Sequence, residues 1–357
     1  MLQFAGLHAA MPEVADGGGE EVEIIVIDDG STDRTGEIAD CYAEKYPETV
    51  RAVHQKNGGH GAGVNKGLSL AAGEYFKVVD SDDWLDEEAL KKLLTEIRKR
   101  KRQRALADLI ICNYLYDHLY EGKQKRMGYE NVFRDGKVCT WDTIGKFHPS
   151  QYLVMHAQIC RTEVLRRSGV RLPRHTFYVD NLFANQPLPF VKTILYLDLD
   201  LYHYFLGRED QSVNEQVLMK RIDQQILVTK MVSGCADLKQ VQKEHPKLAD
   251  YLVRNLSIML SISSIHLLLI GTEEAMEKRN ELWEYMRRRG NGLYRKLRFG
   301  TVSGFTYLPG KAGTALTLAG YRLAKQCYHL TDRKERSYGT DLSGFCGYTG
   351  ILCVHHP

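Results

Sequence analysis

The stretch EVEIIVIDDGSTD, residues 21–33, decides the fold of the N-terminal half of the chain. Residues 22–27 are almost wholly apolar and mostly β-branched, which is typical of a strand buried on both faces in a parallel sheet. Asp28 and Asp29 end that strand, and the Ser-Thr pair that follows can cap a helix beginning near Asp33. The stretch therefore predicts a strand, a turn and a helix.

The same alternation continues toward residue 80. TVRAVHQ (49–55) predicts a second strand, NGGHGAGVNKG (57–67) a glycine-rich turn leading into a helix, and EYFKVVD (74–80) a third strand. This order predicts an α/β, doubly wound domain. Ligands of such sheets bind outside the carboxyl ends of the strands. We therefore expect the acidic residues at 28–29 and 80–83 to line one crevice.

The remaining chain divides into three parts by pattern. Strand-like and helix-like segments continue after residue 86, with a further strand expected at 107–117 and a strand that ends in a polar loop at 193–214. From about residue 215 the pattern is mainly helical. We predict a sheet domain over 1–214, a helical region over 215–330 and a poorly ordered, glycine-rich tail over 331–357.

The composition is ordinary for a soluble globular protein, with 43% hydrophobic and 26% charged residues. A net charge of +3 is too small to indicate a nucleic-acid partner, and we predict none. The basic run KKLLTEIRKRKRQR (91–104) is interpreted as the solvated face of a helix.

Cysteine usage and apolar runs bear on the compartment. The eight cysteines show neither C-x-x-C nor Cys/His zinc spacing, which indicates free thiols in a reducing compartment. Residues 1–20 lack the pattern of a signal peptide. The apolar run LSIMLSISSIHLLLIG (256–271) has only sixteen residues, so we interpret it as a buried helix and predict a cytoplasmic location.

The tetrapeptide DSDD places Asp80, Asp82 and Asp83 at the end of a predicted buried strand. On an extended backbone Asp80 and Asp82 point the same way. Carboxylate oxygens suit a hard cation such as Mg²⁺ or Mn²⁺, which also binds substrate phosphates. The structural alternative is an acidic N-terminus for the helix that follows, and the tetrapeptide alone does not decide between the two.

The two other motifs are also ambiguous when taken singly. IDDGSTD fits a strand followed by an Asx turn, or a carboxylate, Asp29, that accepts hydrogen bonds from a nucleotide. The loop 57–67 matches neither the dinucleotide-binding G-x-G-x-x-G context nor the P-loop. Its glycines let a ligand approach the backbone or only make a tight turn, and its His60 and Lys66 can meet phosphate.

Together and in order, IDDGSTD, the N-G-G-x-G-x-x-x-N-x-G loop and GEYFKVVDSDD resemble the nucleotide-sugar domain of the family-2 glycosyltransferases. The resemblance covers residues 21–100 and extends more loosely to about 214. It implies a GT-A fold with a doubly wound mixed sheet, and a divalent metal, Mn²⁺ or Mg²⁺. It also implies an inverting enzyme that moves a sugar from a nucleotide-diphosphate donor, expected to be a UDP-sugar, to an acceptor hydroxyl.

The resemblance also implies residue roles. Asp29 is expected to contact the nucleotide base, Asp80 the ribose or sugar, and Asp82 the metal on the diphosphate, with Asp83 sharing the metal. Asp180, in FYVDN, is expected to be the base that takes the proton from the acceptor hydroxyl, although Val179 stands where the family often has a second acid.

A later loop, GREDQSV (207–213), resembles the loop that closes the donor site. It suggests that Arg208 neutralises the leaving phosphate and that Gln211 and Ser212 hydrogen-bond to it. The Q-x-x-R-W motif of processive members is absent, which favours a single transfer. The acceptor is expected to be a glycan or lipid-linked precursor of the cell surface, and basic C-terminal helices allow peripheral membrane contact.

The chain departs from the family at its start. Members open with an apolar strand that sits centrally in the sheet, and residues 1–20 contain no such stretch. Loss of a central strand exposes sheet edges and removes one wall of the nucleotide site. A degenerate, non-catalytic binding or scaffold protein is therefore the alternative. A nucleotidyltransferase is a further alternative, but such an enzyme needs a glycine-rich, basic loop near the N-terminus, and this sequence shows none there.

Overall fold

The computed structural model describes residues 22–118, 122–149, 151–206, 215–327 and 349–354. They form two compact units divided near residue 209, and residues 349–354 belong to the first unit.

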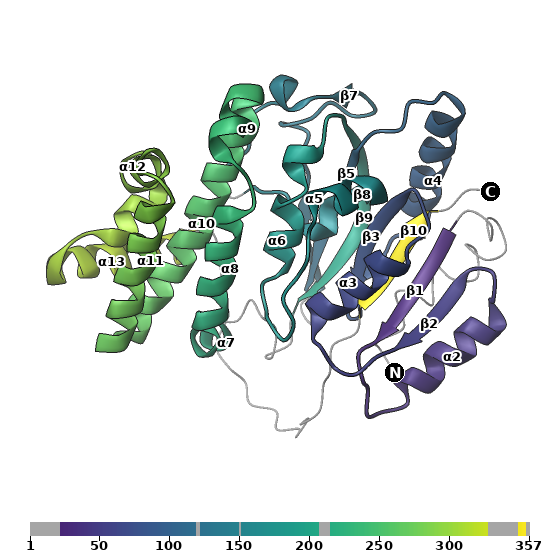
Figure 1. Ribbon diagram of the computed structural model, residues 1–357, viewed down its shortest axis with the longest axis horizontal. Helices are drawn as coiled ribbons and strands as arrows, with labels where there is room; N and C mark the ends of the chain where they lie inside the picture. The colour runs from purple at the N-terminus through teal and green to yellow at the C-terminus, as the bar shows by residue number, and fades with distance from the viewer. Residues whose placement is uncertain (1–21, 119–121, 150, 207–214, 328–348, 355–357) are drawn as a thin grey trace. The chain divides into compact units, whose positions relative to one another are not determined.

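The first unit is built on one mixed, ten-stranded sheet (Figure 1). Its main path runs β2-β1-β10-β3-β8-β5-β9-β4, with β6 beside β5 and β7 beside β9. The β1–β2 and β5–β9 pairs are parallel and the others antiparallel. The strands are β1 (Val22–Asp28), β2 (Val50–His54), β3 (Tyr75–Asp80), β4 (Trp84–Leu85), β5 (Leu109–His118), β6 (Lys123–Met127), β7 (Val138–Cys139), β8 (Gln158–Arg161), β9 (Ile194–Leu206) and β10 (Thr349–Val354).

Helices cover this sheet. α2 contacts β1 and β2, α3 contacts β1 and β10, α4 packs on β9, and α5 packs on β8. α4 shows clearly why its residues form a helix. The Asp86 carboxylate caps its N-terminus by accepting a hydrogen bond from the Ala89 amide at 2.8 Å, and its apolar stripe is buried. This mixed sheet with covering helices agrees with the predicted doubly wound α/β fold class. The helices are α2 (Thr35–Lys45), α3 (His60–Leu70), α4 (Glu87–Arg102), α5 (Thr162–Ser168) and α6 (Asp180–Asn185).

The prediction of a poorly ordered tail is wrong for residues 349–354. This segment is β10, drawn in yellow between β1 and β3 in Figure 1, with Ile351 opposite both Ile25 and Val78. The prediction weighed the polar, glycine-rich surroundings and missed the short apolar run inside them. β1 and β3 would each leave a row of unpaired backbone groups without a strand between them, and β10 pairs with both rows. Other residues of the predicted tail lie outside the described residues.

The second unit is helical, as predicted. It contains α7 (Glu215–Lys220), α8 (Ile222–Gly234), α9 (Leu238–Glu244), α10 (Pro246–Ile270), α11 (Glu273–Arg289), α12 (Asn291–Phe299), the 3₁₀ segment η4 (Val302–Tyr307) and α13 (Gly310–Cys327). Gly271, with φ of 70°, ends α10, and the Thr272 hydroxyl caps α11 by accepting from the Ala275 amide at 3.2 Å.

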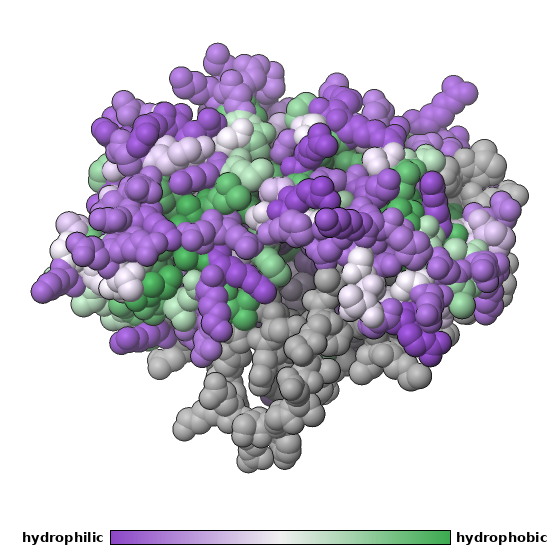
Figure 2. Space-filling model, turned by 60° about the horizontal axis from the view of Figure 1, so that its bottom comes forward, coloured by the Kyte–Doolittle hydropathy of each residue, from purple (hydrophilic) through white to green (hydrophobic). Residues whose placement is uncertain are grey.

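α10 is the helix that contains the apolar run singled out in the sequence. By length and composition it is the one described helix that is long and apolar enough to cross a membrane. Most of its apolar window is buried, and it contacts α8, α9, α11 and α13. This burial agrees with the prediction of a packed helix. The face drawn in Figure 2 carries hydrophilic side chains over most of its described surface, with smaller hydrophobic areas between them.

Candidate functional site

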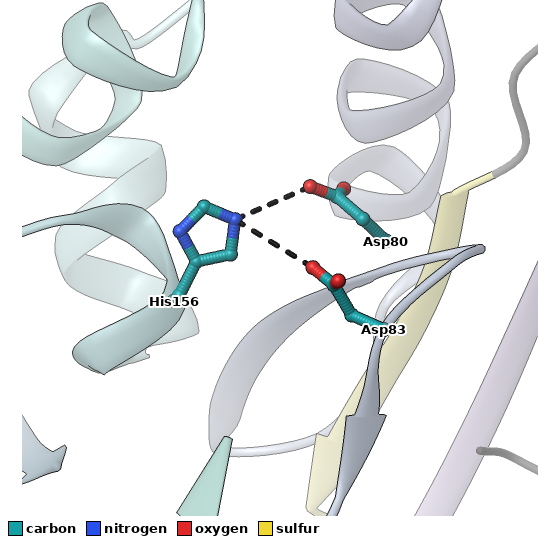
Figure 3. A group of neighbouring side chains, drawn as sticks. All are labelled: Asp80, Asp83 and His156. Atoms are coloured by element: carbon teal, nitrogen blue, oxygen red, sulfur yellow. Dashed lines mark hydrogen bonds and ion pairs between the residues drawn. The ribbon is translucent and has the colours of Figure 1, made fainter. Parts of the chain in front are cut away.

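Two carboxylates and one imidazole converge where β3 ends. Figure 3 shows His156 pointing toward Asp80 and Asp83, and the candidate ligand atoms of the three residues lie within 4.8 Å of one another. His156 Nε2 lies 3.3 Å from Asp80 Oδ2 and 4.0 Å from Asp83 Oδ2. A tight turn, with the Asp83 amide donating to the Asp80 carbonyl at 3.1 Å, brings the two carboxylates to one place.

Strand pairing explains why His156 meets Asp80. In the antiparallel β3–β8 pair, Tyr75 lies opposite Arg161 and Phe76 opposite Cys160. His156 lies two residues before β8, in the 3₁₀ turn Met155–Ala157, and Lys77 of β3 donates from Nζ to its carbonyl at 2.6 Å. The two residues are 76 positions apart in sequence, so only the pairing of these strands brings them together.

The two carboxylates have different environments. Burial alone would raise the pKa of Asp80, but the charges of His60 and His156 and their hydrogen bonds outweigh it and hold that pKa well below its usual range. Burial, together with repulsion from Asp82 and Asp80, raises the pKa of Asp83 well above its usual range. His60 Nε2 lies 2.9 Å from Asp80 Oδ1.

A buried network holds Asp83 and His156 in position. The Tyr202 hydroxyl donates to Asp83 Oδ2 at 2.6 Å, and the Phe205 amide donates to Asp83 Oδ1 at 2.9 Å. Lys77 Nζ donates to the His156 carbonyl at 2.6 Å and lies over the Tyr202 ring at 4.8 Å from its centroid. Burial lowers the pKa of Lys77 to about 8. These contacts hold in place the side-chain atoms of Asp83 and His156 that could bind a metal ion.

Asp180 belongs to the same electrostatic cluster. It is the first residue of α6, and burial raises its pKa, with His156 and His60 opposing that rise and Asp80 adding to it. Tyr178, two residues earlier, has φ of 66°, a left-handed conformation that costs a bulky residue energy. The chain therefore reaches Asp180 through a locally strained turn.

Asp29 lies at the end of β1 and anchors the glycine-rich loop. Its buried carboxylate accepts the Gly58 amide at 2.9 Å, the Gly59 amide at 2.6 Å and the Gln55 side-chain amide at 2.6 Å. Gly59 has φ of 79°, and a Cβ there would lie 3.0 Å from the backbone nitrogen of His175. The anchored loop leads directly into α3, and it places His60, the first residue of that helix, beside the Asp80 carboxylate.

The structure does not bring every predicted site residue to this cluster. Asp82 lies half-buried in the same turn but is not one of the three converging groups, and Lys66 is exposed on α3. Arg208, Gln211 and Ser212 lie outside the described residues. Sequence reasoning missed His156, because a single histidine in the apolar run before β8 gives no local signal.

The converging groups fit a divalent cation. Two carboxylates and one imidazole suit a cation such as Mn²⁺, and Mg²⁺ suits the oxygens. Burial and then repulsion from Asp82 and Asp80 raise the pKa of Asp83, and a bound cation would offset both. The sequence assigned the metal to Asp82 and Asp83, whereas the geometry gathers Asp83 with Asp80 and His156.

The N-terminal part of the chain matches a known protein family. Residues 6–155 match the family model for glycosyl transferase family 2. This segment belongs to glycosyl transferase family 2. The uncharacterized glycosyltransferase YibD of Escherichia coli K12 is 46% identical over 194 residues, which cover 54% of this chain and 55% of YibD. Glycosyltransferase GlyG of Streptococcus pneumoniae is 41% identical over 96 residues, covering 27% of this chain and 30% of GlyG.

A solved structure supports the fold over a longer span of the chain. Staphylococcus aureus TarS 1-349, in complex with UDP-GlcNAc, superposes with a TM-score of 0.62 at 19% identity, covering 92% of this chain and 89% of that one. The chain spans about half or less of the length of the first curated relatives that it matches.

Proposed function

We propose that the protein is a metal-dependent glycosyltransferase that moves a sugar from a nucleotide-diphosphate donor to an acceptor hydroxyl. The observation that carries the proposal is the convergence of Asp80, Asp83 and His156 at the carboxyl end of β3, with Asp180 in the same cluster. In open sheets of this class the ligand binds at that end of the strands. A UDP-sugar is the proposed donor, since TarS, which shares the fold, has been solved with UDP-GlcNAc.

The metal would be held by Asp80, Asp83 and His156, with Asp82 adjacent, and when bound it supplies positive charge for the donor diphosphate. Asp29 orders the glycine-rich loop at the same strand ends and is the proposed contact to the nucleotide. Lys66, together with Arg208, Gln211 and Ser212, is kept as a proposed set of phosphate contacts.

Asp180 is the proposed base. An acceptor hydroxyl must lose its proton as it attacks the anomeric carbon, and burial raises the pKa of Asp180 toward the range in which a carboxylate accepts a proton effectively. Attack from the face opposite the leaving diphosphate gives inversion at the anomeric carbon, and the absence of the Q-x-x-R-W motif supports a single transfer. A cytoplasmic enzyme of cell-surface glycan synthesis with a glycan or lipid-linked acceptor completes the proposal.

The alternative is a non-catalytic relative with a broken nucleotide site, suggested by residues 1–20, which contain no apolar stretch typical of a strand. β10 supports the catalytic proposal over this alternative, because it occupies the sheet position between β1 and β3. β3, which ends at Asp80, is therefore paired along its whole length on the β10 side.

Titration calorimetry with UDP, with and without Mn²⁺, tests the proposal. We expect metal-dependent binding that Asp80→Asn and His156→Gln lose and that Asp250→Asn, an exposed carboxylate of α10, keeps. Asp180→Asn should bind UDP like the wild type but hydrolyse or transfer from a UDP-sugar about 10²–10⁴-fold more slowly. Absence of metal-dependent binding for every nucleoside diphosphate would establish the non-catalytic alternative.

A further inference from the structure

The helical unit contains an open pocket of about 720 Å³ that is unrelated to the carboxylate cluster. Residues from α11, α12, η4 and the start of α13 line it, among them Arg279, Asn280, Arg298, Tyr307 and Lys311. Three of these side chains are cationic, and no aspartate or glutamate is among the residues that line the pocket. A concentration of one charge sign in a concave surface selects ligands of the opposite sign.

Arg279 is the buried member of this set, at 7% exposure. Its Nε and Nη2 donate to the Thr306 carbonyl at 3.1 and 2.6 Å, and its guanidinium lies 4.9 Å from the centroid of the Tyr307 ring. Burial lowers the pKa of Arg279. Within the described part of the chain, no carboxylate forms an ion pair with it. A buried cation without a counter-charge is unfavourable, and an anion in the pocket would offset that cost.

Two further groups present positive charge to the same space. Arg298 donates one bond, from Nη1 to the Gly304 carbonyl at 2.9 Å, and its guanidinium lies 5.6 Å from the centroid of the Tyr307 ring. Lys311 is exposed in the first turn of α13, which begins at Gly310 and has no acidic residue there. The free amides at the start of this 18-residue helix carry partial positive charge and suit an anion.

We propose that this pocket binds the phosphate group of a phosphomonoester or phosphodiester. Guanidinium groups present a planar fork of donors that matches phosphate oxygens, and the α13 amides and Lys311 add donors from a second side. The identification of that phosphoester as part of a glycan or lipid acceptor rests on the proposed glycosyltransferase function. The binding of phosphate itself does not.

Calorimetric titration with sn-glycerol 3-phosphate, and sedimentation with phosphatidylcholine vesicles containing phosphatidic acid, test the site. We expect Arg298→Gln and Lys311→Gln each to raise the dissociation constant for glycerol 3-phosphate by roughly tenfold, since each loses a charge-assisted hydrogen bond. Two matched controls remove a positive charge outside the pocket: Arg295→Gln, on α12 like Arg298, and Lys239→Gln, on α9. Both should bind the probes like the wild type. These exposed or half-buried positions avoid the folding risk of replacing Arg279.

The two probes distinguish the sources of the phosphate. Binding of glycerol 3-phosphate alone supports a soluble phosphoester, and binding of vesicles that is lost in the same two variants supports a lipid phosphate. The proposal is overturned if the wild type binds neither probe, or if the control variants weaken binding as much as the pocket variants. The pocket variants should bind UDP like the wild type. If the wild type binds phosphate but not UDP, that result counts against the proposed function and not against the phosphate site.

Discussion

Replacement of Asp29 by alanine separates two roles for this carboxylate: holding the glycine-rich loop and contacting a nucleotide. In the structure its two oxygens already accept the Gly58 and Gly59 amides and the Gln55 side chain, at 2.6–3.0 Å. Alanine would leave both backbone amides without an acceptor. Each buried donor that loses its partner costs about 1–3 kcal/mol, and Gly59 lies closer to solvent. We therefore expect a loss of ~2–4 kcal/mol in the free energy of unfolding.

Two assays read this prediction. Urea unfolding should give a lower midpoint for Asp29→Ala, and amide hydrogen exchange should become faster at residues 58–60 before it changes elsewhere in the sheet. Asp29→Asn is the graded control, because its amide keeps one acceptor oxygen and the side-chain volume. Its destabilisation should lie between those of the wild type and Asp29→Ala.

One pattern of results would refute this reasoning. If Asp29→Ala unfolds at the wild-type urea concentration, with unchanged exchange at residues 58–60, the carboxylate does not hold the loop. If the same variant then loses UDP binding, Asp29 contacts the nucleotide directly and has no positioning role. Loss of both stability and UDP binding, with partial effects in Asp29→Asn, is the expected outcome.

Two further predictions concern β2 and β10. Hydrogen bonds to Asp28 and Asp40 raise the pKa of His54, whereas the bonds from Ser31 and His54 lower that of Asp28 against its burial. The His54–Asp28 interaction therefore stabilises the fold fully below about pH 6.5, and this stabilisation is lost as the pH rises through the folded pKa of His54. At the acidic end, it is lost as the pH falls through the folded pKa of Asp28. The difference in unfolding free energy between wild type and His54→Gln should be largest near pH 5, at under ~1 kcal/mol for this half-exposed pair, and a difference that grows toward pH 8 would contradict it. Ile351→Pro removes a backbone donor from β10 and should lower both the urea midpoint and UDP affinity, whereas Lys243→Pro, beyond the first turn of α9, should lower stability without changing UDP affinity.

The sequence predicted those parts of the fold whose signals are local. β1 and β3 are buried apolar runs, and α4 has a capping residue and an apolar stripe, so periodicity and turn chemistry were sufficient. β10 was not predictable in this way, because its six residues are a strand only through pairing with β1 and β3. The site also combines residues that the local sequence predicts with one that it does not. Asp80 and Asp83 are three positions apart in one tetrapeptide, whereas His156 reaches them only through long-range packing of the segment before β8 against β3.

The position of Asp80 connects these observations. Its backbone lies opposite Thr349 on the β10 side, and its carboxylate lies 3.3 Å from His156 Nε2 on the other side. β3 is therefore paired with β10 up to Asp80, whereas β8 pairs with the start of β3, at Tyr75 and Phe76, and both strands are antiparallel to it. A change in either pairing should shift Asp80 relative to His156 and so alter the separation of the groups proposed to bind the metal. The geometry of the site is thus a property of long-range strand pairing, and the DSDD motif supplies the carboxylates without fixing their partner.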